Sequence, residues 1–305
     1  MSAPSQSNEV TLLIDGDVIA FTAACAVQRI HEDEFGFVHP FANRYEGEAV
    51  VDNMLITLEM AFQSTHRRIA LSDPKANFRK TIWPDYKANR KESVRPLLLD
   101  ILKAYLRSKY DAFHWPSLEA DDVLGILNTE PQGYAGQRIL VGKDKDFKTV
   151  PGDYHRLKDF DASGKPIVQH ITPWQAQMFH LWQTLAGDMT DGYPGCPGIG
   201  KTRASAILEN PVRLMASMTT ITRGPNKGKP VKAWKAEPTQ DLWACVVSHY
   251  QKGMDADWNI AEQAAMVSAR LAHILQHGDY MQDKDGDRGV IPTIAYWSPE
   301  RIKPQ

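Results

Sequence analysis

Nine acidic residues of this 305-residue chain stand where they could bind metal ions together. They follow apolar runs singly, or occur in pairs and triplets: Asp15, Asp73, Glu119, Asp121, Asp122, Asp144, Asp146, Asp188 and Asp191. Carboxylates that are packed together repel one another unless a cation neutralises them. All-oxygen ligands select hard cations such as Mg²⁺ or Mn²⁺, and two such ions can hold the attacking and leaving oxygens of a phosphodiester. The pattern favours a two-metal site, in which some acids bind through water.

Each acidic group also has a structural interpretation. The triplet at 119–122 could serve as a helix N-terminus, where the helix dipole favours acidic side chains. The pair at 144 and 146 could belong to a solvated turn of mixed charge. The pair at 188 and 191 could share one face of a helical turn, or could lie in an ordinary Asp- and Gly-rich turn.

Three apolar runs predict buried parallel strands that would position these acids, at residues 10–14, 68–71 and 138–142. Each run ends at or just before an aspartate, and helical patterns lie near 46–64, 94–108 and 119–128. Strands that alternate with helices indicate an α/β domain with a mainly parallel sheet. In such sheets, sites form beyond the carboxyl ends of the strands, so Asp15, Asp73 and Asp144 should converge.

The character of the chain changes near residue 171. Residues 151–170 predict hairpin-like strands, whereas helical patterns follow at 174–187, 241–251 and 260–277. Residues 222–238 are basic and rich in Gly and Pro, which predicts an exposed loop. We therefore expect two domains, at 1–170 and 171–305.

The segment at 195–202, GCPGIGKT, satisfies the phosphate-binding pattern of P-loop ATPases. A P-loop must follow a buried strand, and the preceding residues LAGDMTDGYP do not predict one. The alternative is a helix-hairpin-helix-like turn. Backbone N–H groups near Gly198 and Gly200, with Lys201 and Thr202, would then bind DNA phosphates without reading sequence.

Basic and aromatic residues alternate after Asp73. Arg79 and Tyr86 could hold a single strand through phosphate contacts and base stacking. Lys87 and Arg90, three residues apart, could stabilise the charge that develops on the scissile phosphate. The competing interpretation is a solvated loop with ordinary surface charges.

Composition limits the classes of protein that fit. The net charge is −2, but setting the nine acids aside leaves +7, which suits a basic surface around an acidic site. The three cysteines form no CxxC pair and predict neither a zinc site nor a disulfide framework. No apolar run could span a membrane and the polar N-terminal segment is no secretory signal, so we expect a cytoplasmic location.

The ordered combination of these motifs resembles the 5′-nuclease (flap endonuclease-like) superfamily. The motifs are Asp15-Gly16, Ser72-Asp73, Phe78-Arg79, YKANR at 86–90, EADD at 119–122, DKDF at 144–147 and GDMTDGYPGCPGIGKT at 187–202. The resemblance is closest to the 5′-to-3′ exonucleases of short-tailed T-seven-like bacteriophages. It covers residues 10–210, and the ordered set is far more specific than any single motif.

The resemblance implies a PIN-like α/β domain with a central sheet flanked by helices, and a C-terminal helical region with a helix-three-turn-helix motif at 185–210. It implies one metal ion at Asp15, Asp73, Glu119 and Asp121, and a second at Asp144, Asp146, Asp188 and Asp191, with Asp122 bridging or in the outer shell. It places Tyr86, Lys87 and Arg90 on a helical gateway at 77–97, which is short here and favours exonuclease action over threading of long flaps. It also implies a potassium ion at the 195–200 turn.

The expected function is 5′-to-3′ hydrolysis of double-stranded DNA from a free 5′ end, with flap cleavage and action on RNA–DNA hybrids, by a monomer. Two alternatives remain open at this point. A non-catalytic duplex-binding module of the same fold would gain nothing from nine acids that are costly to bury. A PIN-type RNase usually lacks the helix-hairpin-helix-like turn and would cut single-stranded RNA instead of DNA.

Overall fold

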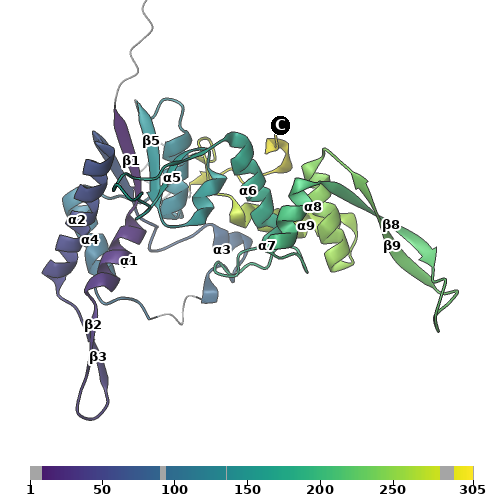
Figure 1. Cartoon of the computed structure of the whole chain (residues 1–305), viewed down its shortest axis with the longest axis horizontal. Helices are drawn as coiled ribbons and strands as arrows, with labels where there is room; N and C mark the ends of the chain where they lie inside the picture. Colours follow the sequence, from purple (N-terminus) through teal and green to yellow (C-terminus); the bar gives the residue numbers. More distant parts are fainter. Residues whose placement is uncertain (1–8, 90–93, 135, 282–291, 305) are drawn as a thin grey trace, which may run out of the picture. The chain divides into compact units, whose positions relative to one another are not determined.

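The structure is a computed structural model that describes residues 9–89, 94–134, 136–281 and 292–304. The chain divides into two compact units, which are described separately (Figure 1). The first unit comprises Met1–Phe78, Glu92–Pro173 and Ile274–Ala295. The second comprises Arg79–Lys91, Trp174–His273 and Tyr296–Gln305. The functional assignment of the two predicted domains stays a prediction.

A five-stranded sheet forms the centre of the first unit, in the order β4-β1-β5-β6-β7. Its strands are β1 (Val10–Asp15), β4 (His66–Ala70), β5 (Gln137–Gly142), β6 (Gly152–Arg156) and β7 (Gln169–Ile171). β4, β1, β5 and β6 are parallel, and β7 is antiparallel to β6. The three predicted parallel strands and the hairpin-like strands of 151–170 are confirmed.

Helices cover both faces of this sheet. α1 (Gly16–Val27), α2 (Arg44–Phe62) and α4 (Leu99–Tyr110) share one apolar core with Leu12 and Ile14 of β1. α5 (Ala120–Thr129) contacts β1, β4 and β5 outside that core, and it lies on the opposite side of the sheet from α1 (Figure 1). Since side chains alternate along a strand, both faces of β1 are buried. The predicted helices at 46–64, 94–108 and 119–128 correspond to α2, α4 and α5.

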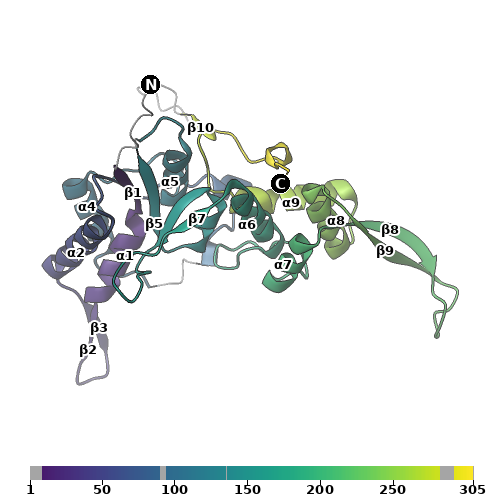
Figure 2. The ribbon, with the colours of Figure 1, turned by 45° about the horizontal axis from the view of Figure 1, so that its top comes forward.

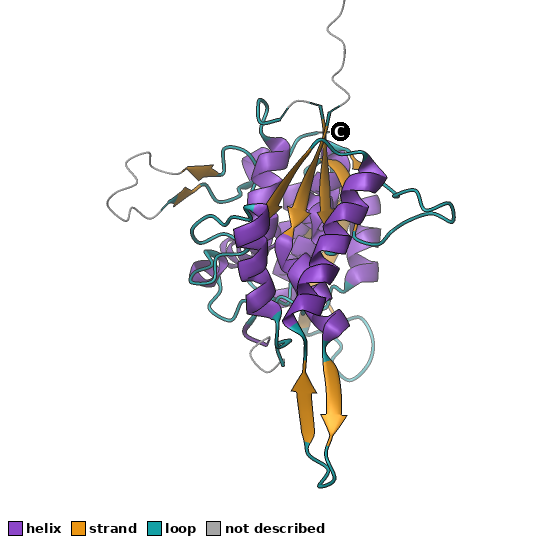
Figure 3. Ribbon diagram, turned by 90° about the vertical axis from the view of Figure 1, so that its left-hand side faces the viewer, coloured by secondary structure: helices purple, strands orange, loops and turns teal. Residues whose placement is uncertain are grey.

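The first unit also contains elements that were not predicted. α1 begins directly after Asp15, and β2 (Arg29–Glu32) pairs with β3 (Val38–Phe41) in an exposed hairpin that extends beyond the helices (Figure 3). The remaining elements of this unit are the 3₁₀ helix η2 (Lys145–Thr149) and the short strands β10 (Tyr280–Met281) and β11 (Thr293–Ile294).

The second unit is mainly helical, as expected for the C-terminal region. It contains α3 (Arg79–Ile82), α6 (Pro173–Ala186), α7 (Lys201–Glu209), α8 (Leu242–Met254), α9 (Trp258–Ala272) and the 3₁₀ helix η3 (Pro299–Arg301). Leu181, Leu185, Val246, Ala261 and Ala265 contribute to its apolar core. α9 ends at Ala272, before the predicted end at residue 277.

The exposed loop predicted at 222–238 is wrong in part. Residues 230–238 form strand β9 (Pro230–Pro238), which pairs along its whole length with β8 (Val212–Thr220). The hairpin extends from the helices of the second unit (Figure 2). Most residues of both strands are exposed, so no apolar run identifies them as strands in the sequence. Among the described residues, no helix is both long and apolar enough to cross a membrane.

Candidate active site

Asp15 is the acid most strongly affected by its surroundings. It caps the N-terminus of α1, where its Oδ1 accepts hydrogen bonds from the backbone N–H groups of Asp17 (2.9 Å) and Val18 (3.2 Å). Asp15 is buried and only 5% exposed. Its burial is the main cause that raises its pKa to about 7, and the negative charges of Asp17 and Asp144 add to the shift. Burial and the neighbouring carboxylates therefore both oppose the charged form of Asp15.

Asp17 was missed by the sequence interpretation, although it lies two residues after Asp15. Its Oδ2 accepts a hydrogen bond from the Ser72 N–H (3.1 Å), and its Oδ1 lies 2.8 Å from Lys103 Nζ. The only available signal was the Asp-Gly-Asp spacing directly after β1. Asp17 thus ties the start of α1 to the loop after β4 and adds negative charge beside Asp15.

Asp73 lies in the loop that follows β4, and backbone groups satisfy both of its oxygens. Oδ1 accepts from the Lys75 N–H (2.9 Å) and Oδ2 from the Ser117 N–H (2.7 Å). Burial raises the pKa of Asp73, but the hydrogen bonds from Lys75 and Ser117 outweigh it, and the pKa lies below its usual value. Asp73 therefore stays ionised and joins its own loop to the segment before α5.

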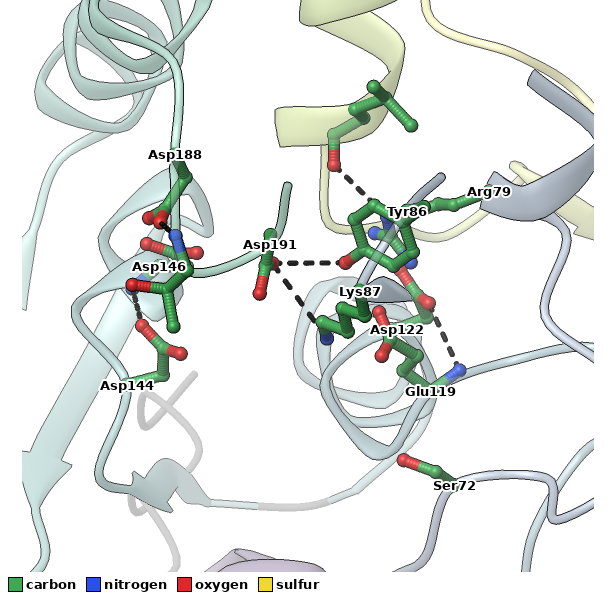
Figure 4. A network of polar contacts seen from close by, with 12 residues as sticks. Ser72, Arg79, Tyr86, Lys87, Glu119, Asp122, Asp144, Asp146, Asp188 and Asp191 are labelled. Atoms are coloured by element: carbon green, nitrogen blue, oxygen red, sulfur yellow. Dashed lines mark hydrogen bonds and ion pairs between the residues drawn. The ribbon is translucent and has the colours of Figure 1, made fainter. Parts of the chain in front are cut away.

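Glu119, Asp121 and Asp122 stand at the N-terminus of α5. Glu119 and Asp122 form a reciprocal capping box, in which Asp122 Oδ2 accepts from the Glu119 N–H at 3.2 Å (Figure 4). Asp122 Oδ1 accepts from the Leu275 N–H at 3.2 Å, and the residue is fully buried. Both oxygens of Asp122 are thus engaged inside the protein, which favours a positioning role over direct metal binding.

Asp144 and Asp146 flank the turn after β5. Asp144 caps η2, where its Oδ1 accepts from the Asp146 N–H (3.0 Å), and its backbone carbonyl accepts from the Tyr154 hydroxyl (2.9 Å). Lys145 Nζ lies 2.9 Å from Asp146 Oδ1. Burial raises the pKa of Tyr154, and the charges of Asp144 and Asp121 add to that shift. The charges of Asp121 and Asp144 therefore both act on Tyr154, and Asp144 also acts on Asp15.

In the second unit, Asp188 and Asp191 lie in the loop between α6 and α7. The expectation of a shared helical face is wrong, because residues 188–193 form a turn closed by backbone pairing of Asp188 with Tyr193. Asp188 Oδ1 accepts from the Thr190 N–H at 2.9 Å, as Asp side chains often do in turns. The competing interpretation of an Asp- and Gly-rich turn is the correct one for the backbone.

Tyr86 and Lys87 contact Asp191 within the second unit. The Tyr86 hydroxyl donates to Asp191 Oδ2 (3.0 Å), and Lys87 Nζ lies 3.8 Å from the same oxygen (Figure 4). The two residues lie in a turn after α3, where Lys87 has φ 56°, so their expected helical position is wrong. Tyr86 is 2% exposed, which favours a packing role over base stacking. Arg90 lies outside the described residues.

Arg79 is buried in the second unit and is 2% exposed. Its Nε donates to the Leu271 carbonyl (3.0 Å) and its Nη2 to the His273 carbonyl (2.7 Å), at the C-terminal end of α9. This geometry favours a structural role over the predicted DNA contact. The sequence carried no sign of it, because the partners lie more than 190 residues away along the chain.

The Gly-rich turn leads into α7 and follows α6, so no strand precedes it and the P-loop interpretation stays excluded. Gly198 has φ +75°, a conformation that favours glycine, and no atom would meet a Cβ at Gly198 or Gly200 within 4 Å. Lys201 and Thr202 are exposed at the N-terminus of α7. The Lys201 and Thr202 side chains and the open backbone N–H groups could donate hydrogen bonds to a phosphate.

Comparison of the sequence with known protein families identifies the family of this chain. Residues 10–172, more than half of the chain, match the model of the "5'-3' exonuclease, N-terminal resolvase-like domain" family. The chain belongs to the 5′–3′ exonuclease family. It is similar to the exodeoxyribonuclease of Enterobacteria phage T3, with 31% identity over 94% of this chain and 92% of that protein. It is also similar to the exonuclease of Escherichia phage T7, with 30% identity over 88% of this chain and 89% of that protein.

The fold is that of a 5′ nuclease with a PIN-like sheet. The flap endonuclease of bacteriophage T5, solved in complex with DNA and metal ions, matches 87% of this chain and 88% of its own, with a TM-score of 0.55 and 16% identity. The predicted family and fold class are confirmed.

The acids of this 5′–3′ exonuclease suit divalent cations by their chemistry. Within the described part of the chain, no three His, Cys, Asp or Glu residues form a compact metal-binding group. However, burial, together with the charges of Asp17 and Asp144, opposes the ionised form of Asp15 and raises its pKa, and a bound cation would favour the ionised form. The donor set consists of carboxylate oxygens, which Mg²⁺ and Mn²⁺ prefer.

Proposed function

We propose that this protein is a divalent-metal-dependent 5′-to-3′ exonuclease that hydrolyses double-stranded DNA from a free 5′ end. The observation that carries the proposal is that Asp15, Asp73 and Asp144 lie at or just after the carboxyl ends of three neighbouring parallel strands, β1, β4 and β5. Acids gathered in this way at one edge of a sheet are typical of a functional site. The family match and the two phage nucleases support hydrolysis of DNA as that function.

Mg²⁺ or Mn²⁺ would be held by two acidic sets. Asp15, Asp73, Glu119 and Asp121 would hold one ion, and Asp144, Asp146, Asp188 and Asp191 the other. Asp122, which is fully buried and hydrogen-bonded at both oxygens, would position the start of α5. Two bound ions would supply charge stabilisation for the attacking and leaving oxygens of the phosphodiester. The T5 structure contains metal ions, which supports metal dependence, and the choice of Mg²⁺ is part of this proposal.

The basic residues after α3 would stabilise the charge that develops on the scissile phosphate. Lys87 has a side chain that is 18% exposed and lies beside Asp191, so its ammonium is held near an acidic residue and partly away from water. A phosphate that displaces this ion pair would gain a charge-assisted hydrogen bond. Arg90 would act in the same way.

The turn before α7 would hold the DNA backbone. Gly198 and Gly200 leave room for close approach, and Lys201 and Thr202 add a charge and a hydroxyl. The turn at 195–200 would also hold a potassium ion, which would supply positive charge for a DNA phosphate.

The substrate range follows from the segment after Phe78. α3 has four residues, and a turn follows it directly, which supports exonuclease action on duplex ends over threading of long flaps. Flap cleavage and removal of RNA from RNA–DNA hybrids would be secondary activities of the same site. The protein would act as a monomer in the cytoplasm of a host cell, where phage DNA is replicated.

Digestion of an end-labelled duplex tests the proposal. A duplex labelled at the 5′ end of one strand should release short labelled fragments early, whereas a 3′ label should shorten gradually, and EDTA should stop both reactions. Asp144→Asn and Asp188→Asn should each lower the rate by at least about 100-fold, because each removes charge from one acidic set. Asp159→Asn changes a partly buried acid outside those sets and is the matched control.

Two other outcomes would replace the proposal. Undiminished duplex binding by wild type without any cleavage would indicate a non-catalytic binding module. Cleavage of single-stranded RNA but not of DNA would indicate a PIN-type RNase.

A further inference from the structure

The β8–β9 hairpin has no role in the proposed hydrolysis. Its two strands pair from Val212 with Pro238 to Thr220 with Pro230, and the ribbon extends away from α8 and α9 (Figures 1 and 2). Residues 212–238 contain six Lys and Arg residues and one Glu, which gives a net charge of +5 in a chain whose total is −2. Positive charge is therefore concentrated on this hairpin.

The base of the hairpin is fixed to the helices of the second unit. Leu214 is buried, and its backbone N–H donates to Ser248 Oγ of α8 at 2.9 Å. The Arg213 guanidinium lies 5.1 Å from the centroid of the Trp258 ring of α9, within cation–π range. Further along the ribbon, Lys232, which pairs with Met218, has its Nζ 2.6 Å from Asp255 Oδ1 at the end of α8. These contacts hold the ribbon to the helices in one direction, so the turn at 221–229 projects at the end of an arm.

The tip of the hairpin presents three exposed cations: Arg223, Lys227 and Lys229. In the described ranges, no acidic side chain lies within ion-pair distance of any of them, whereas Lys232 and Lys235 have acidic partners. The tip has a defined backbone, because the Ile221 N–H donates to the Lys229 carbonyl at 3.0 Å and the Gly228 N–H to the Ile221 carbonyl at 2.9 Å. The three cations are thus held on an ordered turn without a counter-charge of their own.

The two most exposed apolar side chains of the strands do not share one face of the ribbon. Met218 is 69% exposed and Met215 is 47% exposed. Since they are three residues apart on one strand, they point to opposite faces of the ribbon. Strand spacing of about 4.8 Å makes such a ribbon narrow enough for a DNA major groove of about 12 Å. Nine residues extend about 30 Å, the length of roughly nine base pairs.

We propose that the β8–β9 hairpin is a DNA-binding arm that contacts the phosphate backbone of duplex DNA, without reading sequence, through Arg223, Lys227 and Lys229. The choice of DNA as the polyanion rests on the proposed function, whereas the arm itself takes no part in hydrolysis. Its role is to hold the duplex by contacts additional to those of the turn before α7. Each phosphate neutralised by the arm releases counterions, which makes the contribution dependent on salt.

Two matched variants of the full chain test the arm. The first, Arg223→Gln with Lys227→Gln and Lys229→Gln, removes three charges. The second, Arg223→Lys with Lys227→Arg and Lys229→Arg, changes the same positions and keeps every charge. Binding to a fluorescent duplex of about 30 base pairs, a length chosen to exceed the reach of the arm, would be measured without divalent metal over a range of NaCl concentrations.

The neutral variant should bind at least about tenfold more weakly at low salt, and the slope of log K against log salt should fall by about two to three, near 0.9 for each phosphate that the arm no longer neutralises. The charge-keeping variant should match wild type in both quantities. Unchanged binding by the neutral variant, or an equally weakened affinity in both variants, would overturn the proposal. With Mg²⁺ and saturating enzyme, the neutral variant should cut at the wild-type rate. A wild-type protein that binds in this way but never cuts DNA would refute the proposed function and leave the arm intact.

Discussion

Replacement of Arg79 separates a structural role from a DNA contact. Arg79→Ala would remove donors to the carbonyls of Leu271 and His273, at the end of α9 where the helix dipole concentrates negative charge. Each hydrogen bond from a charged donor contributes about 1.5–3 kcal/mol, and carbonyls left buried without a partner carry a desolvation cost. Because Arg79 is 2% exposed, solvent does not screen these contacts. We expect the free energy of unfolding to fall by about 3–5 kcal/mol.

Guanidinium chloride unfolding of the full-length chain would measure this change as a lower midpoint at an unchanged m value. Lys80→Ala is the matched control, because Lys80 is the next residue of α3 and is exposed; its effect should stay within about 0.5 kcal/mol. Arg79→Lys should recover part of the stability, since it keeps the charge but not the planar fork of donors. If Arg79→Ala kept wild-type stability and weakened duplex binding instead, the structural interpretation would be refuted and the DNA contact restored.

Three further predictions concern acids, a tyrosine and two glycines. Burial raises the pKa of Asp15 to about 7, so between about pH 4 and pH 7 the folded metal-free protein holds a proton that the unfolded chain lacks. The free energy of unfolding should therefore fall as the pH rises through this range. Asp15→Asn should flatten this pH profile, measured by denaturant titrations at several pH values. Tyr86→Phe loses the hydrogen bond to Asp191 and should cost about 1 kcal/mol in thermal or denaturant unfolding with unchanged DNA affinity; a selective loss of affinity would instead restore the stacking role. Gly187 has φ +68°, and a Cβ there would lie 2.3 Å from a backbone carbon, whereas Gly198 has φ +75° and open space around it. Gly187→Ala should therefore lower the melting temperature far more than Gly198→Ala, which should cost about 1–2 kcal/mol for the backbone conformation alone. Equal effects of the two variants would contradict the packing argument.

The sheet of the first unit was predictable because burial leaves a signal in the sequence. β1 and β5 contain short apolar runs, and β4 ends in one; each run is followed by or ends at an acid, so parallel topology predicts that these acids share one edge of the sheet. Asp15, which caps α1, was predicted as a metal ligand, whereas Asp17 in the first turn of α1 was not. An acid in the first turn of a helix is ordinary, because the helix dipole favours it there.

The second unit shows why other features could not be predicted. β8 and β9 are exposed on both faces, so they lack the apolar alternation that marks a strand, and the Gly and Pro residues of their connecting turn extended the predicted loop into β9. Tyr86 has the composition of a stacking residue, yet its hydroxyl is bound by Asp191, 105 residues later in the chain. Burial through such distant contacts depends on the tertiary fold and leaves no local pattern.

The acids of the first unit, which look equivalent in the sequence, differ in how the fold treats them. Backbone N–H groups occupy both oxygens of Asp73 and of Asp122, so these two carboxylates are stabilised without any cation. Asp15 receives backbone hydrogen bonds at Oδ1, and its charged form is opposed by burial and by Asp17 and Asp144. Loss of charge should therefore destabilise the metal-free protein at Asp122 and stabilise it at Asp15. Asp122→Asn and Asp15→Asn, compared by unfolding in EDTA at neutral pH, should shift the midpoint in opposite directions, and shifts of the same sign would show that burial and the neighbouring acids oppose the charge of Asp15 too weakly to call for a cation.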